Sequence, residues 1–134
     1  MTTSLDERRE SIAGRVSGKI ALVTGGASGI GRATAILLAE QGARVAVADL
    51  SEADGQEVIR AIESKGGEAF FSRMDVTSEA SVQNTVAQII EKWRCLDVLV
   101  NNAGVAGIQK PIHEVTAKEY DSVMDVNVRG VFHC

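Results

Sequence analysis

Glycines at positions 25, 29 and 31 stand in the stretch "TGGASGIG", between a run that predicts a strand and a pattern that predicts a helix. A loop without side chains can turn sharply, and its N–H groups and the positive end of the helix dipole can then face an anion. The spacing G-x-x-x-G-x-G is not the G-x-G-x-x-G of the general dinucleotide fingerprint. The pattern predicts a pyrophosphate-binding loop, with a plain tight turn as the alternative.

An acidic residue, Asp49, ends the next predicted strand. A carboxylate there can accept hydrogen bonds from both hydroxyls of an adenosine ribose, and it would repel a 2′-phosphate. Neither Leu50 nor the loop residues 26–28 supply the lysine or arginine that a phosphorylated cofactor would need. NAD is therefore preferred over NADP, although an aspartate that simply ends a strand in solvent remains the alternative.

Two further strand ends carry candidate binding residues. Asp75 could accept the amino hydrogen of an adenine while Val76 packs near the ring, but Asp75 equally fits a turn before a helix capped by Thr77 or Ser78. The fourth strand is followed by "NNAG" at 101–104, whose small residues let a ligand approach the backbone and whose amides can connect neighbouring loops.

The elements that must position these residues alternate regularly along the chain. Short apolar runs at 19–24, 43–49, 68–74 and 96–102 predict strands, and helical patterns separate them. We expect an α/β fold: a Rossmann-type doubly wound parallel sheet whose first four strands lie in the order 3-2-1-4. Strands 1 and 4 are then neighbours where the winding reverses, and ligands bind in the crevice beside that point.

Each predicted helix carries an apolar stripe at three- and four-residue spacing that should face the sheet. The stripes are Ile30, Ala33, Leu37 and Leu38; Val58, Ile59 and Ile62, in a helix ending near Gly66; Val82, Val86, Ile89, Ile90 and Trp93; and, from about Thr116, Tyr120, Val123, Met124, Asn127 and Val131.

Composition sets broad limits. The 134 residues suit one domain, and the net charge of −4 without a basic run argues against nucleic acid as a partner.

Cys95 and Cys134 have no paired or metal-ligand spacing, so we expect free thiols. We place His113 in a surface loop and His133 in a helix, neither at a metal site. No signal-peptide or membrane-length apolar run occurs. We expect a cytoplasmic protein without a membrane partner, with a flexible tail at 1–16 and a partial NAD-binding Rossmann domain at 17–134.

Together and in this order, "TGGASGIG", Asp49, "DV" at 75–76, "NNAG" and Asn127 in "VNVRG" resemble the short-chain dehydrogenase/reductase family, from about Ser17 to Cys134. The resemblance implies that the glycine loop binds the pyrophosphate of NAD, Asp49 the adenosine ribose, and Asp75 and Val76 the adenine. Asn101, Ala103 and Gly104 would form the adenosine and ribose side of the crevice. Thr24 would connect "NNAG" to the first strand. The implied cofactor site comprises Gly25, Ser28, Gly29, Ile30, Gly31, Asp49, Leu50, Asp75, Val76, Asn102, Ala103 and Gly104.

The resemblance also implies a reaction, hydride transfer between a nicotinamide and a secondary alcohol or ketone, with a serine, a tyrosine and a lysine four residues after it. Asn127 matches the family asparagine that kinks its helix and binds a water in the proton path. The chain's one tyrosine, Tyr120, is followed at that spacing by Met124, so we expect it to pack in the core. The catalytic serine and the Tyr-x-x-x-Lys motif do not occur in these residues.

Two interpretations stay open. The chain is the cofactor-binding half of an NAD-dependent oxidoreductase cut at Cys134, inactive alone, whose full-length form is a homo-oligomer acting on a small alcohol or ketone. Alternatively it is a non-catalytic nucleotide-binding or partner-binding fragment, in which the fourth strand would be an apolar sheet edge. A serine followed by Tyr-x-x-x-Lys beyond Cys134 would decide for the first.

Overall fold

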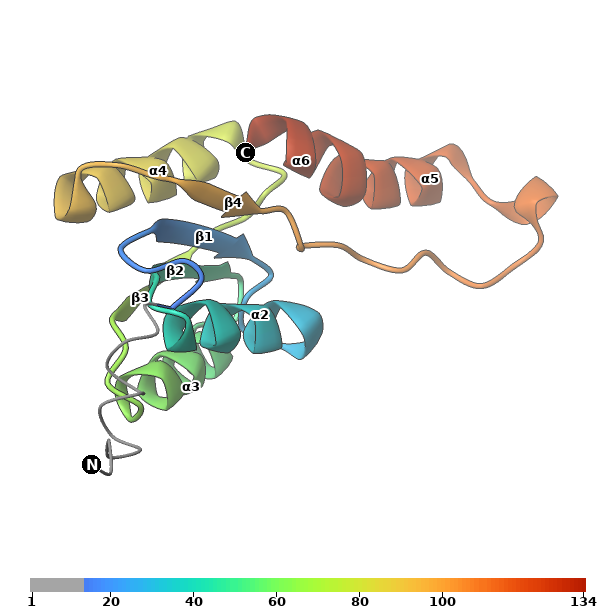
Figure 1. The fold of residues 1–134 in the computed structure, drawn as a ribbon. Helices are drawn as coiled ribbons and strands as arrows, with labels where there is room; N and C mark the ends of the chain where they lie inside the picture. The colour runs from blue at the N-terminus through green and yellow to red at the C-terminus, as the bar shows by residue number, and fades with distance from the viewer. Residues whose placement is uncertain (1–13) are drawn as a thin grey trace, which may run out of the picture.

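A parallel sheet with helices on both faces forms the body of the protein (Figure 1). The computed structural model describes residues 14–134. In it, strands β1 (Ile20–Thr24), β2 (Arg44–Asp49), β3 (Ala69–Arg73) and β4 (Val98–Val100) pair in the order β3-β2-β1-β4, and every pairing is parallel. The predicted strand positions, strand order and doubly wound class are confirmed.

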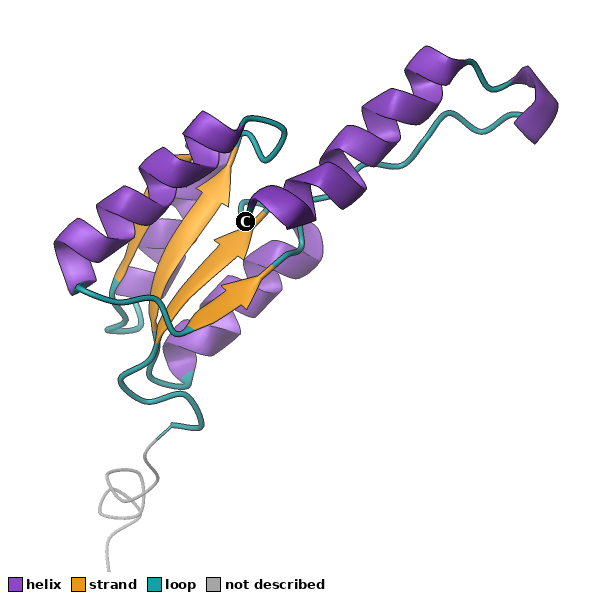
Figure 2. Cartoon of the chain, turned by 90° about the horizontal axis from the view of Figure 1, so that it is seen from above, coloured by secondary structure: helices purple, strands orange, loops and turns teal. Residues whose placement is uncertain are grey.

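Helices α2 (Gly29–Glu40) and α3 (Glu52–Glu63) cover one face of the sheet, and α4 (Glu79–Trp93) covers the other. Figure 2 shows the strands between these layers. Helix α3 ends before the predicted Gly66, which instead ends the following turn with a φ of 80°. After a short 3₁₀ turn, η1 (Ile112–Glu114), the last helix runs through α5 (Ala117–Met124), a π-helical segment η2 (Asp125–Arg129) and α6 (Gly130–His133).

The sheet separates two apolar cores. Alternate strand residues point to opposite faces, so Val23 and Val45 pack under α2 and α3 while Ile20 and Leu22 pack under α4. Both faces of β1 and β2 are therefore buried, which explains why these strands are continuously apolar in the sequence.

The predicted buried stripe of α2 is largely wrong, since of its four residues only Leu38 packs against the core, and it is only partly buried. Ile30 is 80% exposed, Leu37 is 56% exposed, and the helix instead buries Gly31, Ala35 and Ala39. These small residues also recur every four positions, and they allow the helix axis to approach the sheet closely, whereas the bulkier stripe would push it away. Ile30 lies where the helix begins, beyond the covered sheet surface.

The other stripes are closer to their predictions. Val58, Ile59 and Ile62 of α3 are buried. In α4, Val82, Ile89 and Trp93 are buried, but Ile90 is 41% exposed because Thr85 takes the fourth inward position.

The last helix departs further from its prediction: Tyr120 is 55% exposed and Val131 is 45% exposed. Where residues 105–116 and α5 extend beyond the edge of the sheet, no described strand lies beneath the helix (Figure 1). The expected core position of Tyr120 is therefore incorrect.

The start of the described chain lies close to the domain. The Val16 N–H donates to the Gln41 carbonyl at 3.2 Å, and Val16 packs against the core between the sheet and α2. Residues 14–16 of the predicted tail thus contact the fold, while residues 1–13 of that prediction lie outside the described part of the chain.

A buried hydroxyl pair generates a first prediction. Ser72 Oγ on β3 and Thr85 Oγ1 on α4 lie 2.9 Å apart, and both residues are buried. Ser72→Ala or Thr85→Val alone should destabilise the fold by about 1–3 kcal/mol, because the remaining hydroxyl is left without a partner. The double variant should be less destabilised than the sum of the two, as measured by urea unfolding. Gln83→Ala on the exposed face of α4 is the control, and strict additivity would contradict the pairing.

Candidate functional site

A cleft of about 540 Å³ lies at the carboxyl ends of the strands, at the predicted switch point between β1 and β4. Every residue of the predicted cofactor site lines this cleft except Gly31. Four lining residues were not among the predicted cofactor-site residues: Ala48, Met74, Val105 and Val126. Ala48 and Met74 directly precede predicted site residues and Val105 directly follows "NNAG", so adjacency in the sequence could have identified these three. Val126 reaches the cleft only because of the path of the last helix, which the sequence did not indicate.

The glycine loop has a conformation that suits a bound anion. Gly25 and Gly29 have φ values of 62° and 53°, a region that side chains disfavour. Ser28 precedes α2 in an extended conformation, and its side chain makes no capping hydrogen bond. The first N–H groups of α2 therefore remain available at the cleft, together with the positive end of the helix dipole.

Gly31 does not line the cleft, but it allows the segments around the cleft to pack closely. A Cβ at this position would overlap the Gly25 carbonyl oxygen and the Asn102 side-chain amide. Only glycine lets α2, the glycine loop and the "NNAG" loop meet at this point.

The β1 and β4 ends are connected through Thr24. Its Oγ1 accepts hydrogen bonds from the N–H groups of Asn102, at 3.1 Å, and Ala103, at 3.0 Å. The Asn102 Nδ2 donates in return to the carbonyls of Thr24, at 2.9 Å, and Gly25, at 3.1 Å. The predicted role of Thr24 in connecting "NNAG" to the first strand is confirmed. Asn101, by contrast, is exposed and does not line the cleft.

Asp49 is half-buried at the end of β2 and its carboxylate connects two loops. Oδ2 accepts the Ala27 N–H at 3.0 Å, and Oδ1 accepts the N–H groups of Leu50, at 2.7 Å, and Ser51, at 3.2 Å. These bonds fix the orientation of the carboxylate relative to the glycine loop, while Leu50 is exposed beside it. The result is a fixed negative charge on the wall of the cleft.

Asp75 forms the turn that the sequence offered as one alternative, and it also lies on the wall of the cleft. Its Oδ1 accepts the N–H and the hydroxyl of Thr77, at 2.9 and 2.7 Å, which forms the turn before α4. Ser78 caps that helix, since its Oγ accepts the Ser81 N–H at 3.2 Å. Asp75 and the buried Val76 nevertheless both line the cleft.

Asn127 lies outside the cleft but contacts its wall. Its Oδ1 accepts the Val105 N–H at 2.8 Å, and its Nδ2 donates to the Val105 carbonyl at 2.9 Å. The helix departs from α geometry here, because Asn127 is at the centre of η2. Both polar ends of the side chain thus bind the backbone of one residue.

The loop before α5 is fixed by a charged network. Lys110 Nζ donates to Glu119 at 2.8 Å, and the Thr116 N–H and hydroxyl donate to the same carboxylate at 2.8 and 2.9 Å, which completes a capping box. These contacts, led by the Lys110 hydrogen bond, lower the pKa of Glu119 to about 2 from 4.5. Because the folded pKa is depressed, their contribution to stability is fully present above about pH 4.5 and is lost as the pH falls through 2.

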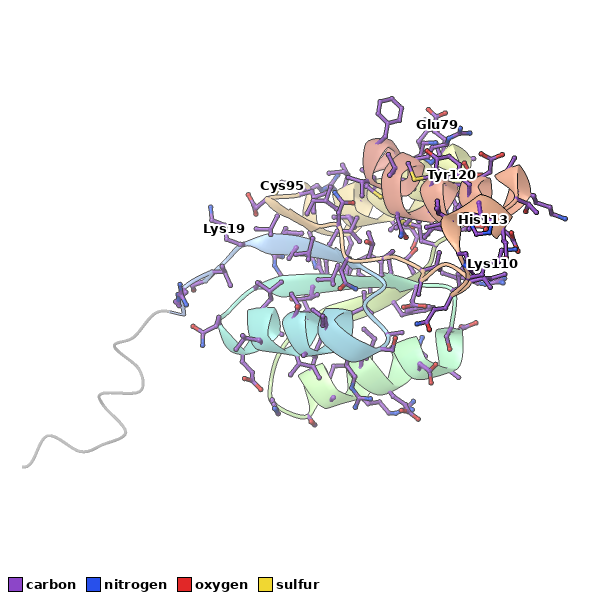
Figure 3. The ribbon with its side chains drawn as sticks, turned by 90° about the vertical axis from the view of Figure 1, so that its right-hand side faces the viewer. Lys19, Glu79, Cys95, Lys110, His113 and Tyr120 are labelled. Atoms are coloured by element: carbon purple, nitrogen blue, oxygen red, sulfur yellow. The ribbon has the colours of Figure 1, made fainter. Side chains whose placement is uncertain are left out.

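The remaining polar candidates do not gather into a second centre. Figure 3 shows Lys110, His113 and Tyr120 on the loop and helix that face the viewer. Within residues 14–134, no three His, Cys, Asp or Glu side chains are arranged to hold a metal ion, and no helix has the length and apolar character to span a bilayer. Both cysteines are free, as expected, and burial raises the pKa of the Cys134 thiol.

Comparison with known proteins identifies the class that this fold and cleft define. A profile of the short chain dehydrogenase family matches residues 19–134. The chain therefore belongs to the short-chain dehydrogenase family, an oxidoreductase family that binds a nicotinamide cofactor.

Individual relatives support the same assignment. A 3beta-hydroxysteroid dehydrogenase from Mediterraneibacter gnavus is 42% identical over 92% of this chain and 45% of its own length. The (+)-borneol dehydrogenase 2 of Salvia officinalis is 42% identical over 94% of this chain and 44% of its own. The crystal structure of a 3-ketoacyl-ACP reductase from Sinorhizobium meliloti 1021 superposes with a TM-score of 0.82 at 38% identity, over 85% of this chain and 45% of that one. The chain thus spans slightly less than half the length of these relatives.

The Thr24 contacts generate a second prediction. Thr24→Val preserves the shape of the side chain but removes the acceptor of two loop N–H groups, so it should destabilise the fold by about 2 kcal/mol. Thr24→Ser keeps the oxygen and loses one methyl group, which should destabilise less, by about 1 kcal/mol. Urea unfolding of both variants measures the difference. If the serine variant were the less stable of the two, packing of the methyl group would outweigh the hydrogen bonds.

Proposed function

We propose that the cleft binds NAD(H), and that the protein acts as an oxidoreductase transferring hydride between the nicotinamide and a secondary alcohol or ketone. Support comes first from the cleft itself, whose glycine loop presents the start of α2 and whose wall carries Asp49. The substrate class is supported by the names of the relatives, which include dehydrogenases of a hydroxysteroid, of cyclopentanol and of borneol.

The single observation that carries the choice of NAD is the position of Asp49. Its carboxylate is fixed by the N–H groups of Ala27, Leu50 and Ser51, so it cannot turn away from a ligand in the cleft without losing these bonds. It would accept hydrogen bonds from the ribose hydroxyls of NAD and repel the 2′-phosphate of NADP. The lining residues around it include no lysine or arginine that would reverse this preference.

In the proposed site, each wall has its own part. Gly25, Ser28, Gly29 and Ile30 bind the pyrophosphate, Gly31 lets the loops approach one another, and Asp49 beside Leu50 orients the adenosine ribose. Asp75 and Val76 border the adenine, and Asn102, Ala103 and Gly104 form the adenosine and ribose side of the cleft. The bound nicotinamide supplies the hydride chemistry.

Asn127 is proposed as a positioning residue that also contributes to the proton path. Its side chain fixes Val105 on the wall, and a relay water would be bound beside it at the irregular η2 segment. The catalytic serine and Tyr-x-x-x-Lys of the resemblance would be supplied by sequence outside these 134 residues. We accordingly propose that residues 17–134 are a partial NAD-binding domain that is inactive alone. The whole enzyme would be a homo-oligomer. Its compartment would be a reducing one such as the cytoplasm, where the two thiols stay free.

A second candidate function has one observation in its favour. Strand β4 pairs with β1 alone among the described strands, and Leu99 at its centre is 36% exposed. Such an apolar edge can bind another strand, as in a non-catalytic nucleotide-binding or partner-binding protein. A chain that binds a partner through β4 but has no measurable affinity for NAD would favour this alternative.

The test of the proposed function is the Asp49→Ala variant. Removing the ribose acceptor should weaken NAD binding about tenfold or more, while NADP binding should be unchanged or stronger because the repulsive charge is gone. Calorimetric titration of the 134-residue chain with both nucleotides measures this. Asp121→Ala, which removes an exposed carboxylate of α5, is the matched control for net charge. Equal NAD affinity in wild type and Asp49→Ala would refute the assignment.

A further inference from the structure

Helix α6 approaches the cleft wall from behind, at Val76. Gly130, at the start of α6, is buried, and a Cβ there would lie 2.7 Å from Val76 Cγ2 and 3.0 Å from its Cβ. Only glycine permits the helix to come this near without displacing the valine. The residue that borders the cleft on one side is therefore in direct contact with the last helix on the other.

A hydrogen bond joins the same two segments one turn further along. His133 Nδ1 lies 2.7 Å from the Val76 carbonyl oxygen, and the ring is half-buried. A carbonyl oxygen can only accept, so Nδ1 carries the proton in this contact. Cys134 packs against the core cluster that contains Val76 and Val126, which fixes the end of the helix beside the contact.

The accepting carbonyl belongs to a peptide unit that is bound at both ends. The Val76 C=O accepts from His133, and the N–H of the same planar unit, that of Thr77, donates to Asp75 Oδ1 at 2.9 Å. Hydrogen bonds in such a chain polarise one another, so the donation from His133 strengthens the bond that orients the Asp75 carboxylate. The imidazole thereby acts on a residue of the cleft that it does not touch.

We propose that His133 is a positioning residue of the nucleotide site: through the Val76–Thr77 peptide it sets the orientation of Asp75 and Val76, and so the wall that receives the adenine. This inference rests on the proposed function, and it adds to the proposed site a residue that does not line the cleft. Its specific consequence is that affinity for the adenine end of the cofactor depends on an Nδ1 donor at position 133, whereas affinity for the nicotinamide end does not.

The test compares His133→Phe with His133→Asn. Phenylalanine keeps the ring and removes the donor, and it should weaken NAD and AMP binding about three- to tenfold while leaving any binding of nicotinamide mononucleotide unchanged. Asparagine offers an amide N–H near the place of Nδ1, and it should restore affinity towards that of wild type. Phe132→Ala, at the neighbouring exposed position, is the control that should change nothing.

Two readouts separate positioning from a purely structural role. Calorimetric titration of the 134-residue chain gives the affinities, and ¹⁵N chemical shifts of the imidazole should show that Nδ1 carries a proton. Loss of adenine affinity in His133→Phe with recovery in His133→Asn would support the proposal. Unchanged AMP affinity in His133→Phe, or equal losses for both nucleotide halves, would overturn it and leave the proposed function standing. A wild-type chain that binds neither NAD nor AMP would overturn both.

Discussion

The hydrogen bonds between Thr24 and the loop at Asn102 and Ala103 are the constraint on which the rest of the cleft depends. They join the carboxyl ends of β1 and β4, the two strands between which the winding of the sheet reverses. Thr24 is almost wholly buried, so water has little access to compete for these hydrogen bonds. Together with the bonds that Asn102 Nδ2 donates to the Thr24 and Gly25 carbonyls, they hold the two loops beside each other where β4 pairs with β1 over three residues only.

Close backbone approach is the second requirement, and it places glycine where the sequence has it. Gly31 lies against the Gly25 carbonyl and the Asn102 amide, so α2 can begin directly beside both loops. The next buried positions along the helix, Ala35 and Ala39, also have small side chains, so the helix stays close to the sheet. The start of α2 is thereby held near the place where an anion would bind.

The last helix connects opposite sides of the cleft. Asn127 bonds to both backbone groups of Val105 after β4, while Gly130 and His133 contact Val76 after β3. A regular α-helix would not be expected to direct all three residues in this way, since the π-helical segment shifts the residues that follow it relative to those before it. The irregularity at Asn127 is thus tied to the geometry of two walls that lie far apart in the sequence.

The sequence by itself determined the strand positions, their order, and most of the residues that line the cleft. This was possible because continuous apolar runs, glycine spacing and strand-end polar residues are local features, and the rules of parallel crossovers then bring the strand ends together. Tertiary structure alone decided which face of α2 is buried. The bulky set that includes Leu37 and the small set that includes Ala35 both have helical spacing, and only close packing on the sheet favours the small residues. It also decided that Tyr120 is exposed and that His133 reaches Val76, since both depend on where an irregular helix lies relative to the sheet.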